Sequence, residues 1–254
     1  MNRHPSASSP RIAQASRLLG LDLLALAARS APNTPSARRA AAVAATLAAA
    51  RTLADLIAST NAPRAIVLLV GPSGSGKSTI FRALRLALRQ RHLAVITPAP
   101  ARTLAPHAHR RAADLAPFLP VAAWLRLLSA VGLAEAGLLG ARLADFSEGQ
   151  AHRLALALAL ARAAYTPPAR PHHAAPRIWI ALDEFTSVLD RATARSLAAG
   201  LARAARSESI APNLAGLLLA TAHADLEDPL TPDLAVHTRY LGAPRIFTRP
   251  EAAP

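Results

Sequence analysis

The residues best suited to chemistry form a glycine-rich run, Gly71-Pro72-Ser73-Gly74-Ser75-Gly76-Lys77-Ser78-Thr79. Its spacing matches the phosphate-binding pattern G-x-x-x-x-G-K-[ST]. Glycines let such a loop turn its backbone N–H groups around phosphates, because a Cβ there would hinder the approach. We therefore expect these nine residues to hold ATP, with Lys77 on the β- and γ-phosphates and the Ser78 hydroxyl on Mg²⁺.

The use of lysine supports this prediction. The chain has 29 basic residues, and Lys77 is its single lysine. Arginine is a planar fork, whereas lysine is a compact, flexible point charge that can reach between phosphates. A chain that otherwise uses arginine has kept an ammonium group inside this loop.

Two further candidates follow apolar runs of strand length. Asp183 and Glu184 come directly after Ile178 to Leu182, so their carboxylates should lie at the carboxyl edge of a sheet, where Asp183 would hold Mg²⁺ and Glu184 would deprotonate the attacking water. The alternative is an acidic pair that begins a helix on the surface. His223 follows the run 217–221 and could touch the γ-phosphate, although a lone histidine at a strand end is more often structural.

A fourth motif is Asp145-Phe146-Ser147-Glu148-Gly149-Gln150, which precedes a helix predicted to run through Arg162. Taken alone, Ser147 or Asp145 could simply cap that helix.

In order, these motifs resemble the Walker A, signature, Walker B, D-loop and switch-histidine motifs of ATP-binding cassette (ABC) ATPases, with the D-loop at Ser187-Val188-Leu189-Asp190. The resemblance covers roughly residues 64 to 240. In that family the signature of one protomer caps the ATP of the other. The resemblance therefore implies a head-to-tail homodimer. In that dimer the contacts to the nucleotide are completed by the partner's copies of four residues, Ser147, Gly149, Gln150 and Asp190.

The chain departs from that family in four ways. Glu148 takes the place of a signature glycine and adds a negative charge near the partner's phosphates. No glutamine occurs between Arg91 and Phe146 to act as the Q-loop ligand, and Phe185 replaces the proline usual in transporters. No evident aromatic residue precedes the glycine-rich run to stack on adenine. The segment 183–191 is similar to a non-transport branch, sometimes joined to an acetyltransferase-like domain, so a membrane partner is the weaker expectation.

Strands that alternate with helices predict an α/β P-loop fold with a largely parallel sheet and a small helical subdomain. We expect a tail and helical extension over 1–62 and an ATPase domain over 63–254, with the helical subdomain at about 100–165. The predicted strands are 65–70, 93–97, 178–182 and 217–221. Six helices are predicted. Four of them are 16–29, 77–91, the signature helix and 191–206. A fifth begins at Ser36, with one apolar face formed by Val43, Leu47, Ala50, Leu53 and Ile57, and a sixth follows Pro120, with one apolar face formed by Trp124, Leu127, Leu128 and Val131.

Composition narrows the classes of protein. The 254 residues are 52% apolar, which suits one main domain, and the absence of cysteine excludes disulfides, thiol catalysis and iron–sulfur clusters. The loop histidines at 107, 109, 172 and 173 lack partners at metal-ligand spacing. No window of 18 residues is free of charge, so we expect no membrane segment and a cytoplasmic location.

The net charge of +14 would attract polyanions, and residues 1–64 carry eight arginines against two aspartates. The alternative explanation for this positive charge is a general preference for arginine in the chain, together with the binding of ATP itself. We therefore expect a soluble ATPase that acts on a macromolecule, with nucleic acid as a candidate partner. The alternatives are the ATPase subunit of a transporter and an ATP-dependent scaffold with weak turnover.

Overall fold

The computed structural model describes residues 35–59, 64–166, 177–240 and 244–248. The chain divides into two compact units, 1–44 and 45–254, and all the described strands belong to the second. The predicted helix at 16–29 lies outside the described residues, and the domain division at residue 62 stays a prediction.

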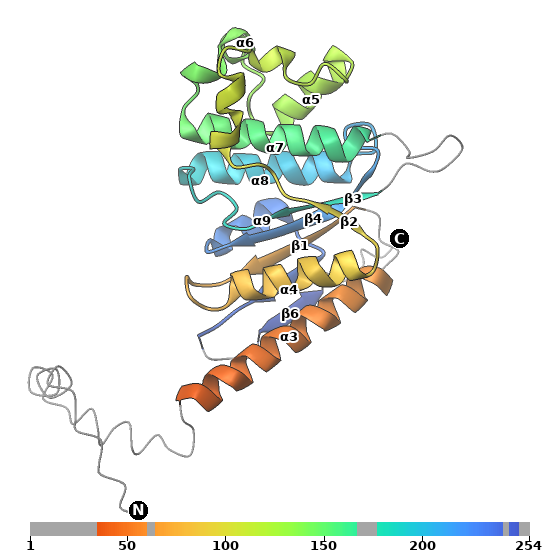
Figure 1. Ribbon diagram of the computed structural model, residues 1–254, viewed down its shortest axis with the longest axis vertical. Coiled ribbons are helices and arrows are strands. Elements are labelled where there is room, and N and C mark those ends of the chain that lie inside the picture. Colours follow the sequence, from red (N-terminus) through yellow and green to blue (C-terminus); the bar gives the residue numbers. More distant parts are fainter. Residues whose placement is uncertain (1–34, 60–63, 167–176, 241–243, 249–254) are drawn as a thin grey trace, which may run out of the picture. The chain divides into compact units, whose positions relative to one another are not determined.

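A six-stranded, mostly parallel sheet forms the centre of the second unit, which confirms the predicted α/β fold (Figure 1). Its order is β2-β3-β4-β1-β5-β6, and neighbours are parallel except for the antiparallel pair β5–β6. The strands are β1 (Ala65–Val70), β2 (Ala94–Ile96), β3 (Ile178–Leu182), β4 (Leu214–Thr221), β5 (Leu234–His237) and β6 (Arg245–Thr248).

Helices cover both faces of this sheet. Figure 1 shows α7 (Glu148–Tyr165) and α8 (Arg191–Arg206) on one side and α4 (Lys77–Gln90) with the later part of α3 (Pro35–Ser59) on the other. Successive residues of β1 enter opposite cores: Ile66 and Leu68 face the α7 and α8 side, whereas Val67 and Leu69 face the α4 side. This explains why β1 is a continuous apolar run, because both of its faces are buried.

The apolar face predicted for α3 is partly wrong. Ala50, Leu53 and Ile57 are buried, but Leu47 is 43% exposed. The side chain of Val43 lies outside the described set. Among the described side chains of α3, those that join the core begin at Ala50, about one turn after Leu47.

A helical region lies in the sequence between β2 and β3, which are neighbours at one edge of the sheet. It contains α5 (Val121–Ala130), α6 (Ala136–Gly140) and the short 3₁₀ segments η1 (Ala101–His107), η2 (Ala112–Asp114) and η3 (Leu143–Asp145). The predicted face of α5 is buried as expected, and Trp124 donates its indole N–H to the carbonyl of Ala112 at 2.9 Å. A Cβ on Gly200 would lie 2.1 Å from the carbonyl oxygen of Ala130, so this glycine lets α8 pack closely against the end of α5. No helix in the described residues combines the length and apolarity needed to cross a membrane.

Two predicted strands have different bounds in the structure, and the first is β2, which covers Ala94–Ile96 rather than 93–97. β4 begins at Leu214 rather than at 217, because Gly216 interrupts the apolar pattern. That glycine is required by packing, since a Cβ would lie 2.4 Å from the carbonyl oxygen of Ala65. β5 and β6 were not predicted, because each has only four residues and gives little periodic signal.

Candidate nucleotide-binding site

The carboxyl ends of β1, β3 and β4 meet at one edge of the sheet and surround a cavity of about 460 Å³. Asp183 and Glu184 follow β3, His223 follows β4, and the glycine-rich loop follows β1. Ser73, Gly74, Gly76 and the three residues from Lys77 to Thr79 line the cavity, whereas Gly71, Pro72 and Ser75 do not. Ligands of open α/β sheets bind in this kind of position.

The glycine-rich loop is braced by the chain that follows β5. A Cβ on Gly71 would lie 2.1 Å from Oγ1 and 2.5 Å from the carbonyl oxygen of Thr238, so only glycine fits. The Thr238 hydroxyl shares a hydrogen bond with that of Ser75 at 2.6 Å, and the Tyr240 hydroxyl donates to the carbonyl of Ser73 at 2.7 Å. Sequence reasoning missed both residues, because the strand before them was not predicted.

Lys77 lies at the start of α4 and points back into the loop. Its Nζ donates to the carbonyls of Gly71 at 2.6 Å and Pro72 at 2.8 Å. Partial burial lowers the pKa of Lys77, while the negative charges of Asp183 and Glu184 act in the opposite direction. The ammonium group is therefore placed between the loop backbone and two carboxylates.

The structure brings the two expected Mg²⁺ ligands together. The Ser78 hydroxyl donates to Oδ1 of Asp183 at 3.3 Å, although the residues are 105 positions apart. A hydroxyl and a carboxylate are the hard oxygen donors that Mg²⁺ prefers. A Cβ on Gly76 would meet nothing within 4 Å, so the loop leaves an open cradle beside them. Both features fit a nucleotide with its metal.

Glu184 lies in a strained segment. Its φ is 56° and that of Thr186 is 70°, which costs L-residues of order 1–3 kcal/mol each. Between them Phe185 is buried, and its N–H donates to the carbonyl of Ala220 at 2.7 Å. Because α8 begins only at Arg191, the acidic pair does not start a helix, and that alternative is wrong.

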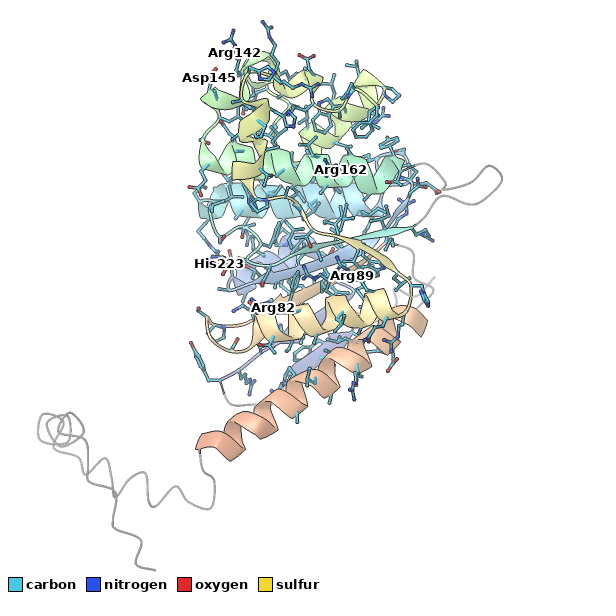
Figure 2. The ribbon with its side chains drawn as sticks, viewed as in Figure 1. Arg82, Arg89, Arg142, Asp145, Arg162 and His223 are labelled. Atoms are coloured by element: carbon cyan, nitrogen blue, oxygen red, sulfur yellow. The ribbon has the colours of Figure 1, made fainter. Side chains whose placement is uncertain are left out.

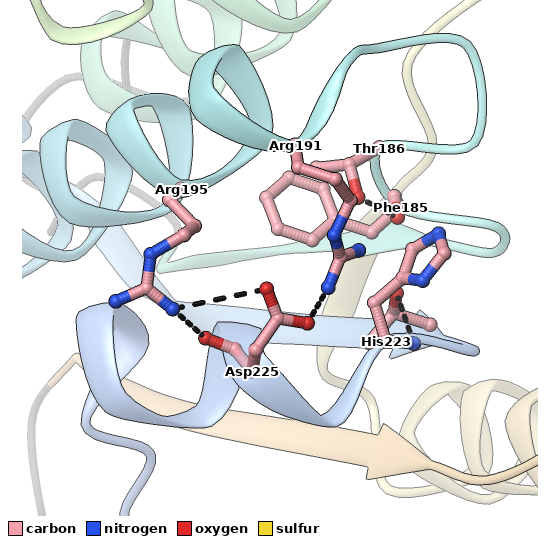
Figure 3. Close-up of polar contacts among 7 residues, drawn as sticks. Phe185, Thr186, Arg191, Arg195, His223 and Asp225 are labelled. Carbon is pink, nitrogen blue, oxygen red and sulfur yellow. Dashed lines mark hydrogen bonds and ion pairs between the residues drawn. The ribbon is translucent and has the colours of Figure 1, made fainter.

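His223 lines the same cavity, and its backbone N–H donates to the Thr221 hydroxyl at 3.2 Å. Burial, and then the positive charge of Arg191, lower the pKa of His223, which favours a neutral imidazole at neutral pH. Figure 3 shows how the segment after β4, which contains His223 and Asp225, is held in place. Arg191 and Arg195 lie one turn apart on α8, and both pair with the Asp225 carboxylate. Arg195 also donates to the Asp225 carbonyl at 2.7 Å.

The expected partner-side residues do not line this cavity. Ser147 caps α7 by accepting from the Gln150 N–H, and the Gln150 side chain accepts from the Ser147 N–H at 2.9 Å. Asp190 caps α8 by accepting from the Thr193 N–H at 2.9 Å. A Cβ on Gly149 would lie 3.0 Å from the Leu189 side chain, so the signature and the D-loop are neighbours.

Asp145 and His223 lie along the same edge of the ribbon, toward the left in Figure 2. Asp145 is the first residue of the signature motif, so the start of the signature and His223 of the nucleotide-binding cavity lie toward one side of this unit in that view.

A second cavity, also of about 460 Å³, shares Asp183, Glu184 and Ser187 with the first. Glu148 and His152, one turn apart on α7, line its other side. Within the described residues, Nε2 of His152 is buried without a hydrogen-bond partner, and burial lowers the pKa of His152. Sequence reasoning did not single out His152, because nothing in its local pattern sets it apart from other helix residues.

The fold and the cavity define a P-loop nucleotide-binding ATPase. Comparison with known families agrees, since the family model described as an AAA ATPase domain matches residues 48–219. The chain therefore belongs to this AAA ATPase domain family.

Solved structures with a similar fold include a nucleotide-free ATP-binding cassette from an ABC transporter, at 14% identity and a TM-score of 0.45 over 74% of this chain and 81% of that one. Another is the archaeal ribosome recycling factor aABCE1 in complex with the archaeal ribosomal stalk protein aP1, at 18% identity and a TM-score of 0.46. That match covers 73% of this chain and only 38% of the other. No curated protein sequence matches the chain.

Proposed function

We propose that this chain hydrolyses ATP with Mg²⁺ at the cavity beside the glycine-rich loop, in the manner of an ABC-type ATPase. One observation carries the proposal: Lys77, the Ser78–Asp183 pair, Glu184 and His223 surround the same cavity. These are the groups that phosphoryl transfer requires, namely a cation, metal ligands and a base.

Each group has a distinct role in this proposal. The loop N–H groups and Lys77 bind the phosphates and oppose their charge. Ser78 and Asp183 would hold Mg²⁺, which would supply positive charge to offset that of the phosphates. Glu184, held at its strained φ, accepts a proton from the attacking water, and neutral His223 hydrogen-bonds the γ-phosphate.

We further propose that turnover requires a head-to-tail homodimer. Ser147, Gly149, Gln150 and Asp190 contribute nothing to the cavity of their own protomer, which is consistent with contacts to the nucleotide of the partner. The exposed apolar side chain of Val188 in the D-loop, 42% exposed, would be covered in such a dimer.

The substrate of the ATP-driven cycle is proposed to be a macromolecule, with nucleic acid favoured by the net charge of +14. The ATPase subunit of a membrane transporter is the second candidate. The lack of a glutamine between Arg91 and Phe146 and the presence of Phe185 argue against it. An ATP-dependent scaffold is the third, and the placement of Glu184 and His223 at the cavity favours turnover instead.

The test is steady-state ATP hydrolysis by the full chain, with and without double-stranded DNA. Glu184→Gln should abolish hydrolysis while ATP still binds. Glu208→Gln, at an exposed carboxylate remote from the cavity, is the matched control and should retain full activity. Hydrolysis that survives in Glu184→Gln would remove the assigned base. Stimulation by DNA that weakens with salt would support a nucleic-acid partner. Hydrolysis indifferent to DNA would point to a protein partner, and binding without turnover would support the scaffold.

A further inference from the structure

The structure offers an aromatic side chain next to the glycine-rich loop, although none was evident before the loop in the sequence. Tyr240 lies three residues after β5, the neighbour of β1 on the side away from β4. Thr238 ties that segment to β1, since its N–H donates to the carbonyl of Val70 at 2.7 Å. Tyr240 therefore lies at the same sheet edge as the cavity.

The order of the strands gives a bound nucleotide a direction, and this step rests on the proposed function. Along the sheet edge, Glu184 follows β3, His223 follows β4, the phosphate loop follows β1, and Tyr240 follows β5. Water must attack the γ-phosphate on the side of Glu184 and His223. The nucleoside must then leave the loop on the opposite side, toward β5.

Tyr240 is built to receive a planar group at that position. Its hydroxyl donates to the carbonyl of Ser73 at 2.7 Å, and its Cε1 lies 3.6 Å from where a Cβ on Gly74 would be. The hydroxyl and one ring edge thus rest on the first half of the loop. The side chain as a whole remains 64% exposed, so ring surface stays free.

We infer that Tyr240 is the platform on which the nucleobase of the bound nucleotide stacks. A tethered phenol presents its π-face at little entropic cost, because the hydroxyl bond already restricts the ring. Stacking does not read the edge of a base, so the platform serves nucleoside triphosphates as a class without selecting the base.

Binding of two Mg²⁺-loaded ligands, ATP and inorganic tripolyphosphate, to the full-length chain separates the base from the phosphates. Calorimetry should show that Tyr240→Ala weakens the binding of ATP by roughly 5- to 100-fold, which is the range expected for the loss of one stacked base. The affinity for tripolyphosphate should not change, because that ligand has no base. Tyr240→Phe keeps the ring and should retain most of the ATP affinity. Phe118→Ala, which removes another exposed aromatic ring far from the loop in sequence, is the control and should change neither ligand.

Equal losses for both ligands in Tyr240→Ala would show that the residue only supports the loop. Unchanged binding of both would place the base elsewhere. Either result overturns the inference and leaves the proposed function standing. If the unaltered chain bound neither ligand, the proposed function and this inference would fail together.

Discussion

Replacing Gly76 by alanine tests whether phosphates lie over the loop, because the structure separates the effect on folding from the effect on binding. Gly76 has a φ of 93°, and a Cβ there would meet no atom within 4 Å. It also lines the cavity. The added methyl group would therefore cause no clash in the empty protein and would project into open space.

The cost to folding follows from the backbone alone. A left-handed conformation costs an L-residue about 1–2 kcal/mol. Loss of glycine's freedom in the unfolded chain returns about 0.4–1 kcal/mol. The net loss is then about 1 kcal/mol, which lowers the melting temperature by about 2–4 °C for a chain of this size. The variant stays folded, so a loss of binding can be assigned to the cradle.

The assay compares ATP affinity with thermal unfolding for Gly76→Ala and for Gly140→Ala. The control glycine also has nothing within 4 Å of its would-be Cβ, but it lies in α6 without a left-handed φ. Gly140→Ala should bind ATP normally and unfold at the same or a slightly higher temperature. Gly76→Ala should bind ATP more than about tenfold more weakly, a loss above 1.4 kcal/mol. ATP affinity equal to that of the unaltered chain, with the expected drop in melting temperature, would refute the placement of phosphates over this loop.

Three further predictions concern the surroundings of the cavity. Phe185 is 1% exposed, so Phe185→Ala should lower the free energy of unfolding by about 3–5 kcal/mol in urea titrations, against at most about 0.5 kcal/mol for exposed Phe118→Ala. Glu148→Gly removes a charge expected near the partner's phosphates and should raise ATP turnover at low salt; an advantage that persists at high salt would exclude an electrostatic cause. The lowered pKa of His223 means that its proton is gained only below the ordinary value of 6.5, so kcat should fall on acidification below that pH. In Arg191→Met this acid limb should move upward, since a repulsive charge is removed; a limb that does not move would show that another group is titrating.

The central strands could be predicted from the sequence because burial and motif coincide. β1 and β3 occupy the predicted ranges, since each apolar run is continuous and ends at the first residue of a motif, Gly71 or Asp183. β5 could not be predicted, because it has only four residues and begins shortly after a proline, so it shows too little alternation of apolar and polar residues. Its position was set by pairing with β1, a contact between residues more than 160 positions apart.

The same distinction applies to the site. The glycine-rich loop, Asp183, Glu184 and His223 each follow a buried run, so their meeting at one edge follows from a parallel sheet. The groups that hold them in place are different. These groups act through side-chain contacts between segments distant in the sequence, namely those of Thr238, of Tyr240 and of Asp225. No local spacing of residues predicts such contacts.

Phe185 shows how a departure from a motif can be explained by a contact. The N–H of residue 185 donates to Ala220, which lies on β4 three residues before His223. Proline has no N–H and could not form this bond. The bond joins the segment of Glu184 to the strand that carries His223, and the Asp225 pairing with α8 joins the same two segments a second time. With phenylalanine at 185, the segments of the expected base and of the expected γ-phosphate contact are therefore joined beside the same cavity before any nucleotide or partner arrives, and part of the strain at Glu184 is offset by burial of the adjacent ring.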